Sequence, residues 1–543
     1  MFYRKQPEHD PPPYDVSEVD RAIDAMTVEE LRALLRAMRD RLEYEPLVEL
    51  EGTLIAHAAR GSAGWKPTGP PTTVLDEVGE FVTAARCTGR ADPEEVDIFL
   101  RQARNAFLAG DPELACAIFD SLLPPIADCE IDLGHHEMLD EVITTDLREC
   151  SAQYLASVYL TTPEEDRPAA LRVAINVVEP ITWVHDPLEQ METAAAAPLP
   201  DLEDFLPRWV SLLETETGND CEWDRSSASW LREAVRRFEG ISGLERIARK
   251  TKQPEMLLSW CRAVVETGDW EQVFRAYDDA ARLTTSSIWR GTFLDGVALA
   301  ARELGRDDFT RRLKDAWYGS PSLERLVRWL GEGDPPAPEV RQRAEEVLPA
   351  CPAGEIRQVG LLKLLSGELQ SAAELLAEAP GLGWSAFKHP GHILFPAFAG
   401  LLAGSNPADL STLLFAELDD RVQGRYYSTW IDDEEPQHEA PSIVALITNA
   451  RPAIGLDVER QRAMLTAMKA AATGRVEGIL GMKRRQAYRH TARLVVCCLE
   501  LAPAVGLQDE VTPWFEDLRT EYRRFRAFQG EIALALALMS GQG

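Results

Sequence analysis

Four similar segments of this chain begin at a glycine and continue into an amphipathic helix. They are GDPELACAIFDSL from Gly110, GDWEQVFRAYDDA from Gly268, GRDDFTRRLKDAW from Gly305 and GELQSAAELLAEA from Gly367. In each segment we expect the glycine to end one helix and a polar residue to start the next. The helix after Gly268 carries one narrow apolar stripe, at Val273, Tyr277, Ala280 and Ala281. A single stripe cannot form a core alone, so each such helix must pack against a neighbouring one.

Residues at fixed distances from these glycines are also similar. The fifth residue after each glycine is small or β-branched, and the ninth is large and apolar in three of the four segments. In order they are Ala115, Val273, Thr310 and Ala372, then Phe119, Tyr277, Lys314 and Leu376. The corners resemble the second half of a tetratricopeptide (TPR) repeat, with a good match at the first two glycines, a fair one at Gly367 and a poor one at Gly305. Only the step from Gly268 to Gly305 is near that family's period of about 34 residues. We therefore predict an all-α fold, an irregular TPR-like helical-hairpin solenoid.

Helical periodicity covers most of the chain and is interrupted by stretches rich in Pro, Gly or acidic residues. Thr27 and Glu30 form a capping-box pattern ahead of an apolar stripe at Leu31, Leu34 and Leu35. The predicted regions are a flexible Pro-rich tail (1–16), N-terminal helices (17–60), helical repeat region 1 (73–193), TPR-like repeat region 2 (202–331), helical repeat region 3 (340–431) and C-terminal basic helices (442–543). We predict flexible loops at 331–339 and 426–442, which a partner could contact or order, or at which the chain could be cleaved.

Charge and composition restrict the function. The 543 residues carry a formal net charge of −32, which repels polyanions over most of the surface and favours a basic or amphipathic protein partner. The charge is uneven, because from Arg460 onward thirteen Lys and Arg stand against eight Asp and Glu, which leaves about −37 on the rest. The nine Cys form no CxxC pair, and neither a signal-peptide h-region nor a membrane-spanning apolar run is present. We expect a cytoplasmic protein with buried thiols and no membrane contact.

Several helical segments together suggest a family resemblance. They include EELRALLRAM, ARNAFLAGDPELACAIFDSLL, SWCRAVVETGDWEQVFRAYDDAARL, HPGHILFPAFAGLLAG and RRQAYRHTARLVVCCLEL. These segments resemble the helical region of bacterial SWIM zinc-finger proteins and follow one another in the same order as in that family. The SWIM finger itself requires a CxC and a later CxH, and this chain has neither. The resemblance therefore implies the TPR-like helical region of that family, without the zinc or DNA role of the finger.

Two segments carry residues that could form a catalytic or metal site. In DCEIDLGHHEMLDE (128–141), Cys129, His135, His136 and Asp140 could supply metal ligands, but HHEML lacks the second His of HExxH. We favour a polar loop that enters a helix. Ser385 and Lys388 match SxxK, but Pro390 interrupts the helix that this motif requires and no KTG follows. GxSxG, P-loop and GxGxxG motifs are absent, so we predict no enzyme activity, no cofactor and no metal.

The basic end is a candidate contact surface for a partner or for nucleic acid. Its residues are Lys483, Arg484, Arg485, Arg489, Arg523 and Arg524, with Arg493 and Arg526 nearby. Tyr488, Tyr522 and Phe525 lie between them and could stack on single-stranded nucleic acid. We favour the simpler interpretation, a solvated basic face that balances the acidic remainder of the protein.

The favoured function is a non-enzymatic scaffold that binds another protein through its helical repeats. The thirteen Trp are expected mainly in hairpin cores, with some on a binding surface. One alternative is an accessory or regulatory subunit of a bacterial defence or transcription-control complex, cleaved by a protease or sequestering a partner. Another is nucleic-acid binding through the basic C-terminal helices.

Overall fold

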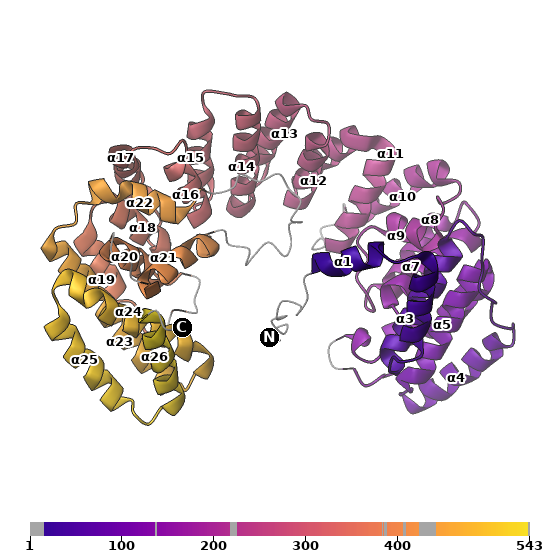
Figure 1. Cartoon of the computed structure of the whole chain (residues 1–543). Helices are drawn as coiled ribbons and strands as arrows, with labels where there is room; N and C mark the ends of the chain where they lie inside the picture. Colours follow the sequence, from indigo (N-terminus) through magenta and orange to yellow (C-terminus); the bar gives the residue numbers. More distant parts are fainter. Residues whose placement is uncertain are drawn as a thin grey trace. The chain divides into compact units, whose positions relative to one another are not determined.

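The computed structural model describes residues 16–135, 138–217, 225–382, 384, 388–404, 409–422 and 441–540. These residues form helices α1 to α26 and contain no β-strand, only an isolated bridge between Arg90 and Asp132 (Figure 1). The all-α prediction is confirmed. The chain divides into two compact units, Met1–Arg246 and Ile247–Gly543, and the division falls inside the predicted region 202–331.

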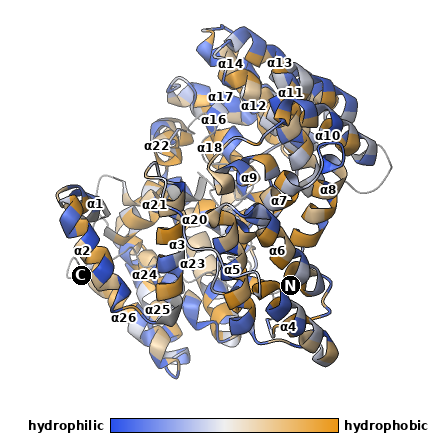
Figure 2. Cartoon of the chain, turned by 90° about the vertical axis from the view of Figure 1, so that its right-hand side faces the viewer, coloured by the Kyte–Doolittle hydropathy of each residue, from blue (hydrophilic) through white to orange (hydrophobic). Residues whose placement is uncertain are grey.

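The first unit, called unit 1 below, is built from helices that pack against near neighbours in sequence. Its helices are α1 (Val16–Asp24), α2 (Val28–Arg39), α3 (Tyr44–Arg60), α4 (Val74–Thr88), α5 (Pro93–Ala109), α6 (Pro112–Ala127), α7 (Leu147–Thr161), α8 (Arg167–Val178), α9 (Pro187–Ala195), α10 (Leu202–Thr217) and the start of α11 (Arg225–Thr251), with a 3-10 turn, η1 (Leu139–Glu141). Helix α6 packs between α5 and α7, and α7 also contacts α8 and α9. Hydrophobic and hydrophilic residues share the same helices, as expected for elements with one buried side (Figure 2).

The second unit, unit 2, combines a sequential stack with long-range returns. Its helices are α12 (Pro254–Val265), α13 (Trp270–Leu283), α14 (Ser287–Glu303), α15 (Phe309–Gly319), α16 (Leu323–Gly331), α17 (Ala337–Val347), α18 (Ile356–Ser366), α19 (Leu369–Ala377), α20 (Gly391–Ala403), α21 (Asp409–Val422), α22 (Ile443–Ile454), α23 (Val458–Gly481), α24 (Tyr488–Val505), α25 (Gln508–Glu521) and α26 (Arg526–Met539), with 3-10 turns η2 (Leu348–Ala350) and η4 (Arg485–Ala487). Helices α12 to α16 each pack on the next one, as in a solenoid. In contrast, α22 returns to α17 and α23 returns to α19, so the later hairpins close on earlier ones.

The four corner glycines have the predicted backbone conformation. Gly110, Gly268, Gly305 and Gly367 have φ of 95°, 71°, 62° and 85°. These left-handed values end a helix with little steric penalty only when the residue lacks a Cβ. Asp111 and Asp269 then cap the next helix by accepting a hydrogen bond from a backbone N–H.

The predicted stripe of α13 is buried against α12 and α14. Val273 and Ala280 are fully buried, and Tyr277 and Ala281 are each less than 8% exposed. The ring of Tyr277 lies against Gly296 of α14, where a Cβ would collide with the ring. The absence of a side chain at position 296 therefore sets how closely these two helices approach.

The corner at Gly305 differs from the other three in register. Its helix begins at Phe309, four residues after the glycine, whereas the other helices begin two residues after theirs. The buried residues are consequently Leu313 and Trp317, and the predicted core positions Thr310 and Lys314 are only partly buried. The poor match of this segment comes from a late helix start and not from a missing hydrophobic stripe.

The predicted capping box of α2 is confirmed, since Glu30 N–H donates to Thr27 Oγ1 at 3.3 Å. No residue of α2 is buried, however, and Leu34 of its apolar stripe is 42% exposed. The predicted flexible loop 331–339 is only the short link between α16 and α17. Arg343 holds this link by donating to the carbonyl oxygens of Trp329 (2.9 Å) and Glu332 (3.2 Å).

The remaining predicted loop and tail lie mostly outside the described residues, as residues 1–15 and 423–440 do. In the part of the chain that the structure describes, no helix has the length and hydropathy needed to cross a bilayer.

Candidate functional site

A cavity of about 640 Å³ lies in unit 1 between α3, α5, the segment from Met138 to Glu149, and Ile181–Trp183. Its volume is within the range of about 300–1,000 Å³ that is typical of ligand sites in proteins. The lining combines aliphatic side chains, such as Val48 and Ile143, with charged ones from all sides. We treat this cavity, called the unit 1 cavity below, as the candidate binding site.

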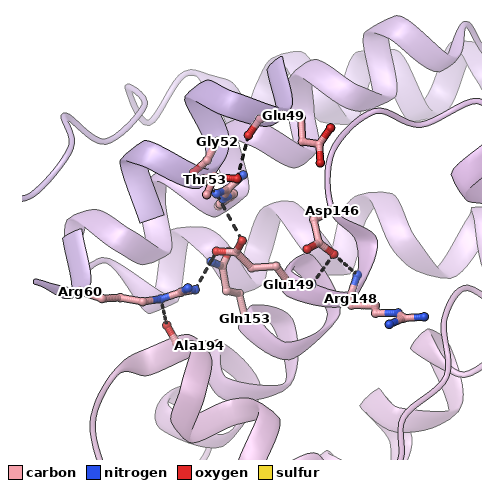
Figure 3. Close-up of polar contacts among 10 residues, drawn as sticks. Glu49, Gly52, Thr53, Arg60, Asp146, Arg148, Glu149, Gln153 and Ala194 are labelled. Atoms are coloured by element: carbon pink, nitrogen blue, oxygen red, sulfur yellow. Dashed lines mark hydrogen bonds and ion pairs between the residues drawn. The ribbon is translucent and has the colours of Figure 1, made fainter. Parts of the chain in front are cut away.

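The carboxylate of Glu149 lies at the centre of a hydrogen-bond network in the wall of the unit 1 cavity (Figure 3). It pairs with Arg60 Nη2 at 2.7 Å and with Arg104 Nη2 at 3.3 Å, and it accepts a hydrogen bond from Gln153 Nε2 at 2.9 Å. Arg104 also donates to the carbonyl oxygen of Gly52. Because these groups come from α3, α5 and α7, the network fixes the three helices that form this wall.

Local sequence explains how Glu149 reaches this position. Asp146 is the N-cap of α7, and its Oδ1 accepts from the N–H groups of Arg148 (2.9 Å) and Glu149 (3.1 Å). The first turn of a helix favours a carboxylate, so Glu149 occupies an electrostatically favourable place. On α3, Gly52 leaves room for the guanidinium, since a Cβ there would lie 2.5 Å from Arg104 Nη1.

Two buried polar groups of cavity-lining residues have unused hydrogen-bonding capacity. They are Arg104 Nε, a donor, and Thr145 Oγ1, and neither has a partner among the residues that the structure describes. The backbone of Thr145 is held separately, because its N–H donates to Asp97 Oδ1 at 2.8 Å. The wall of the cavity thus contains two polar atoms that are buried without being satisfied by a described residue.

Large exposed apolar side chains border the unit 1 cavity. Trp183 is 56% exposed and Met138 is 46% exposed, although both belong to types that proteins usually bury. The acidic lining residues are Glu49, Asp140, Asp146 and Glu149, and the basic ones are Arg101, Arg104 and Arg148. The arrangement can hold an apolar side chain at the edge and make charged hydrogen bonds within.

The candidate metal ligands of segment 128–141 come from loop structure and a short turn. Asp140 lies on the 3-10 turn η1, outside any α-helix, and His136 lies outside the described residues. Cys129 is exposed and has a left-handed φ of 56°. Within the described residues, no three His, Cys, Asp or Glu side chains are grouped to hold a metal ion. The segment instead supplies Met138 and Asp140 to the unit 1 cavity.

The structure places the predicted basic residues on two exposed turns of unit 2. Lys483, Arg484 and Arg485 lie between α23 and α24, Arg489 is in the first turn of α24, and Arg523 and Arg524 lie between α25 and α26. All six are exposed, and none forms an ion pair with another described residue. Arg493 differs, since it pairs with Glu417 at 3.1 Å and is mostly buried.

The aromatic residues between these cations do not form a stacking surface. Tyr488 is 5% exposed and packs edge-on against Phe528, with ring centroids 5.8 Å apart. Tyr522 and Phe525 pack on each other and are partly buried. Lys483 and Arg484 do not share a helical face with Tyr488, because α24 begins only at Tyr488.

The other sequence candidates take no part in the unit 1 cavity. Ser385 of the SxxK match lies outside the described residues, and Lys388 pairs with Glu355 at 3.2 Å. Cys497 and Cys498 are fully buried, and burial raises the pKa of the Cys497 thiol to about 12. Such a thiol is protonated and unreactive at neutral pH.

Sequence motifs did not identify the unit 1 cavity. Its lining residues lie between positions 48 and 183 and come from separate helices and loops. The one signal in the sequence was Trp183 itself, in the segment ITWVHDP, but nothing in the spacing separates it from the Trp residues of the core.

Comparison with known proteins gives little further information. No family model and no curated protein matches this chain. Among solved structures, it is similar to a circular tandem repeat protein described as having a novel repeat topology and enhanced subunit contact surfaces. The two are 17% identical, and the match covers 92% of this chain and 96% of that one, with a TM-score of 0.20. A TM-score this low carries no argument about fold or function.

Proposed function

We propose that this chain is a non-enzymatic scaffold that binds a segment of another protein in the unit 1 cavity. The observation that carries the proposal is Trp183, which stands 56% exposed at a cavity of about 640 Å³. Exposed tryptophans beside a pocket are typical of residues that dominate the binding energy of protein interfaces. The helical-repeat architecture is compatible with this role, because such folds commonly present extended binding surfaces.

The charges predict the chemistry of the segment. Asp140 and Asp146 are exposed acidic groups of the lining, and Asp146 uses one oxygen to cap α7. We infer that the partner supplies a Lys or Arg to these carboxylates and an apolar side chain to Trp183 and Met138. This is a basic amphipathic segment, which the net charge of −32 would also attract over longer distances.

The proposal is tested by comparing two tryptophan variants in quantitative affinity capture with the full chain. Trp183→Ala removes the proposed contact, and Trp65→Ala is the matched control, since Trp65 is 47% exposed in unit 1 but does not line the cavity. A central interface tryptophan contributes about 2 kcal/mol or more, which corresponds to roughly 30-fold in affinity. We expect a specific partner to be lost from Trp183→Ala and retained by Trp65→Ala. Equal recovery with both variants would reject the cavity as the binding site.

The second candidate function is nucleic-acid binding at the basic end, favoured by its six exposed cations without ion-pair partners among the described residues. The buried Tyr488 weighs against base stacking there. An accessory or regulatory role in a larger complex would use the same cavity, and it remains a prediction from the sequence. The proposed cytoplasmic location is likewise a prediction from the sequence.

A further inference from the structure

Arg475 of α23 is a buried cation that has no acidic partner in the part of the chain that the structure describes. Arg475 is only 6% exposed, and no described carboxylate forms an ion pair with its guanidinium. Among the described residues its Nε has no hydrogen-bond partner, and its guanidinium makes one long hydrogen bond, from Nη1 to the carbonyl oxygen of Gly381 at 3.4 Å. Buried arginines are normally paired, because an unpaired charge away from water is costly.

The immediate surroundings of Arg475 are aromatic and basic. Its guanidinium lies 5.8 Å from the ring centroid of Trp384, and His490 approaches the same ring at 5.6 Å. His392 lies 6.0 Å from that ring on another side. The Trp384 ring supplies a cation–π contact, which is weaker than a full counter-charge for a desolvated guanidinium.

A second arginine adds to the positive charge. Arg484 is exposed on the turn after α23, where its N–H donates to the carbonyl oxygen of Ile479 at 3.1 Å, and Ile479 lies one helical turn beyond Arg475. Burial lowers the pKa of Arg475 to about 10, and the charge of Arg484 adds to this shift. Lys483, Arg485 and Arg489 lie next to Arg484 in sequence, are exposed, and have no ion-pair partner among the described residues. Arg475 and Arg484 repel each other, and no described acid lies between them to offset the repulsion. A bound anion would neutralise this electrostatic repulsion.

We propose that Arg475 and Arg484 form a binding site for the phosphoryl group of a small phosphorylated molecule, with Lys483, Arg485 and Arg489 providing further positive charge. Guanidinium groups bind phosphate oxygens through paired hydrogen bonds, and the planar donors suit two oxygens at once. His389 is not a ligand, because its Nε2 bonds to the carbonyl oxygen of Pro380 and its Nδ1 accepts from Gly391 N–H, each at 3.0 Å. The site lies in unit 2 and is independent of the proposed function of the unit 1 cavity.

A small anion fits these observations better than nucleic acid does. Tyr488, the aromatic residue nearest the cations in sequence, is buried and cannot stack on a base. The net charge of −32 repels a long polyanion, whereas a single phosphoryl group interacts mainly with the local cations. The ligand is therefore a free phosphate or the phosphate of a small metabolite such as a nucleotide.

The test measures ligand binding to the full chain at a constant ionic strength of about 150 mM, so that screening of charge is the same in every sample. The probes are inorganic phosphate, ADP and a single-stranded oligonucleotide, measured by calorimetry and by the shift in melting temperature. The variants are Arg475→Met and Arg484→Ala, with Arg523→Ala as the matched control on the other basic turn. Because Arg484 is exposed, its variant tests the site even if Arg475→Met fails to fold.

We expect phosphate or ADP to bind saturably to the wild type and to Arg523→Ala. Binding should be weaker by at least about tenfold in Arg484→Ala and lost in Arg475→Met. Tighter binding of ADP than of phosphate would identify a nucleotide, and the reverse order would identify the free anion. The proposal is overturned if neither small probe binds the wild type, if Arg484→Ala binds as the wild type does, or if only the oligonucleotide binds.

Discussion

Replacing Glu149 with leucine should destabilise unit 1, because it leaves the guanidinium of Arg104 buried without a counter-charge. The side chain of Arg104 is 7% exposed, and after the substitution its only protein partner would be the carbonyl of Gly52. Breaking a buried ion pair by removing one partner costs about 3–5 kcal/mol. The side chains of Glu149 and Arg60 are 16% and 26% exposed, so water can relieve part of the loss. We therefore expect the free energy of unfolding to fall by about 3 kcal/mol, near the lower end of that range.

The double variant Glu149→Leu/Arg104→Met provides the control. It removes the buried cation together with its partner and should be within about 1 kcal/mol of the wild type, since apolar replacements of buried pairs are often neutral. The two substitutions should then show a coupling energy of about 2 kcal/mol or more. Urea unfolding of the full chain gives the free energies, and hydrogen exchange of peptides from α3 and α7 assigns the loss to this network. The reasoning is refuted if the double variant is as unstable as Glu149→Leu, or if Glu149→Leu itself costs less than about 1 kcal/mol.

Three further predictions concern packing and pH. Val273→Asp buries an unpaired carboxylate in the α13 seam and should cost about 3 kcal/mol, so an unchanged melting temperature would contradict the assigned face. Gly296→Ala forces a Cβ into the ring of Tyr277 and should cost about 1–3 kcal/mol, whereas Gly79→Ala, with open space around it on α4, should be neutral or slightly stabilising in the same denaturation assay. Burial raises the pKa of Glu233 from 4.5 to about 7, despite the bonds that its carboxylate accepts. The carboxyl group of Glu233 thus binds its proton more tightly in the folded than in the unfolded state. The resulting contribution to the free energy of unfolding is complete below about pH 4.5 and disappears as the pH rises through about 7. The unfolding free energy of the wild type should fall over that interval relative to Glu233→Gln, and parallel pH profiles would contradict the assignment.

The sequence was sufficient to predict the helices and the corners that join them. Glycines followed by a polar residue predicted the left-handed corners, and the spacing of Val273 and Tyr277 predicted which side of α13 is buried. These features depend on local conformation and periodicity, which a single segment carries by itself. The same periodicity was less informative in α2, where no residue is buried and Leu34 of the apolar stripe is exposed.

Long-range packing and the candidate site could not be read from the sequence in this way. The return of α22 to α17 and of α23 to α19 depends on contacts between segments about 100 residues apart, for which a helical stripe specifies no partner. The unit 1 cavity likewise depends on contacts between segments that are distant in sequence, since Trp183 and Glu49 line it from different elements. Similarly, Arg475 is one arginine within an ordinary helical pattern, and only the fold shows that it is buried beside Trp384 and away from any described acid.

Photocrosslinking from position 183 tests the central claim, that the unit 1 cavity binds another protein, most directly. A photoreactive p-benzoylphenylalanine would replace Trp183 in one version of the full chain and Trp65 in another, both expressed in the cells that produce this protein. We predict that illumination links a discrete partner protein to the chain from position 183 and not from position 65, and that the linked peptide contains basic and apolar residues. No crosslink from position 183, or the same products from both positions, would contradict the account.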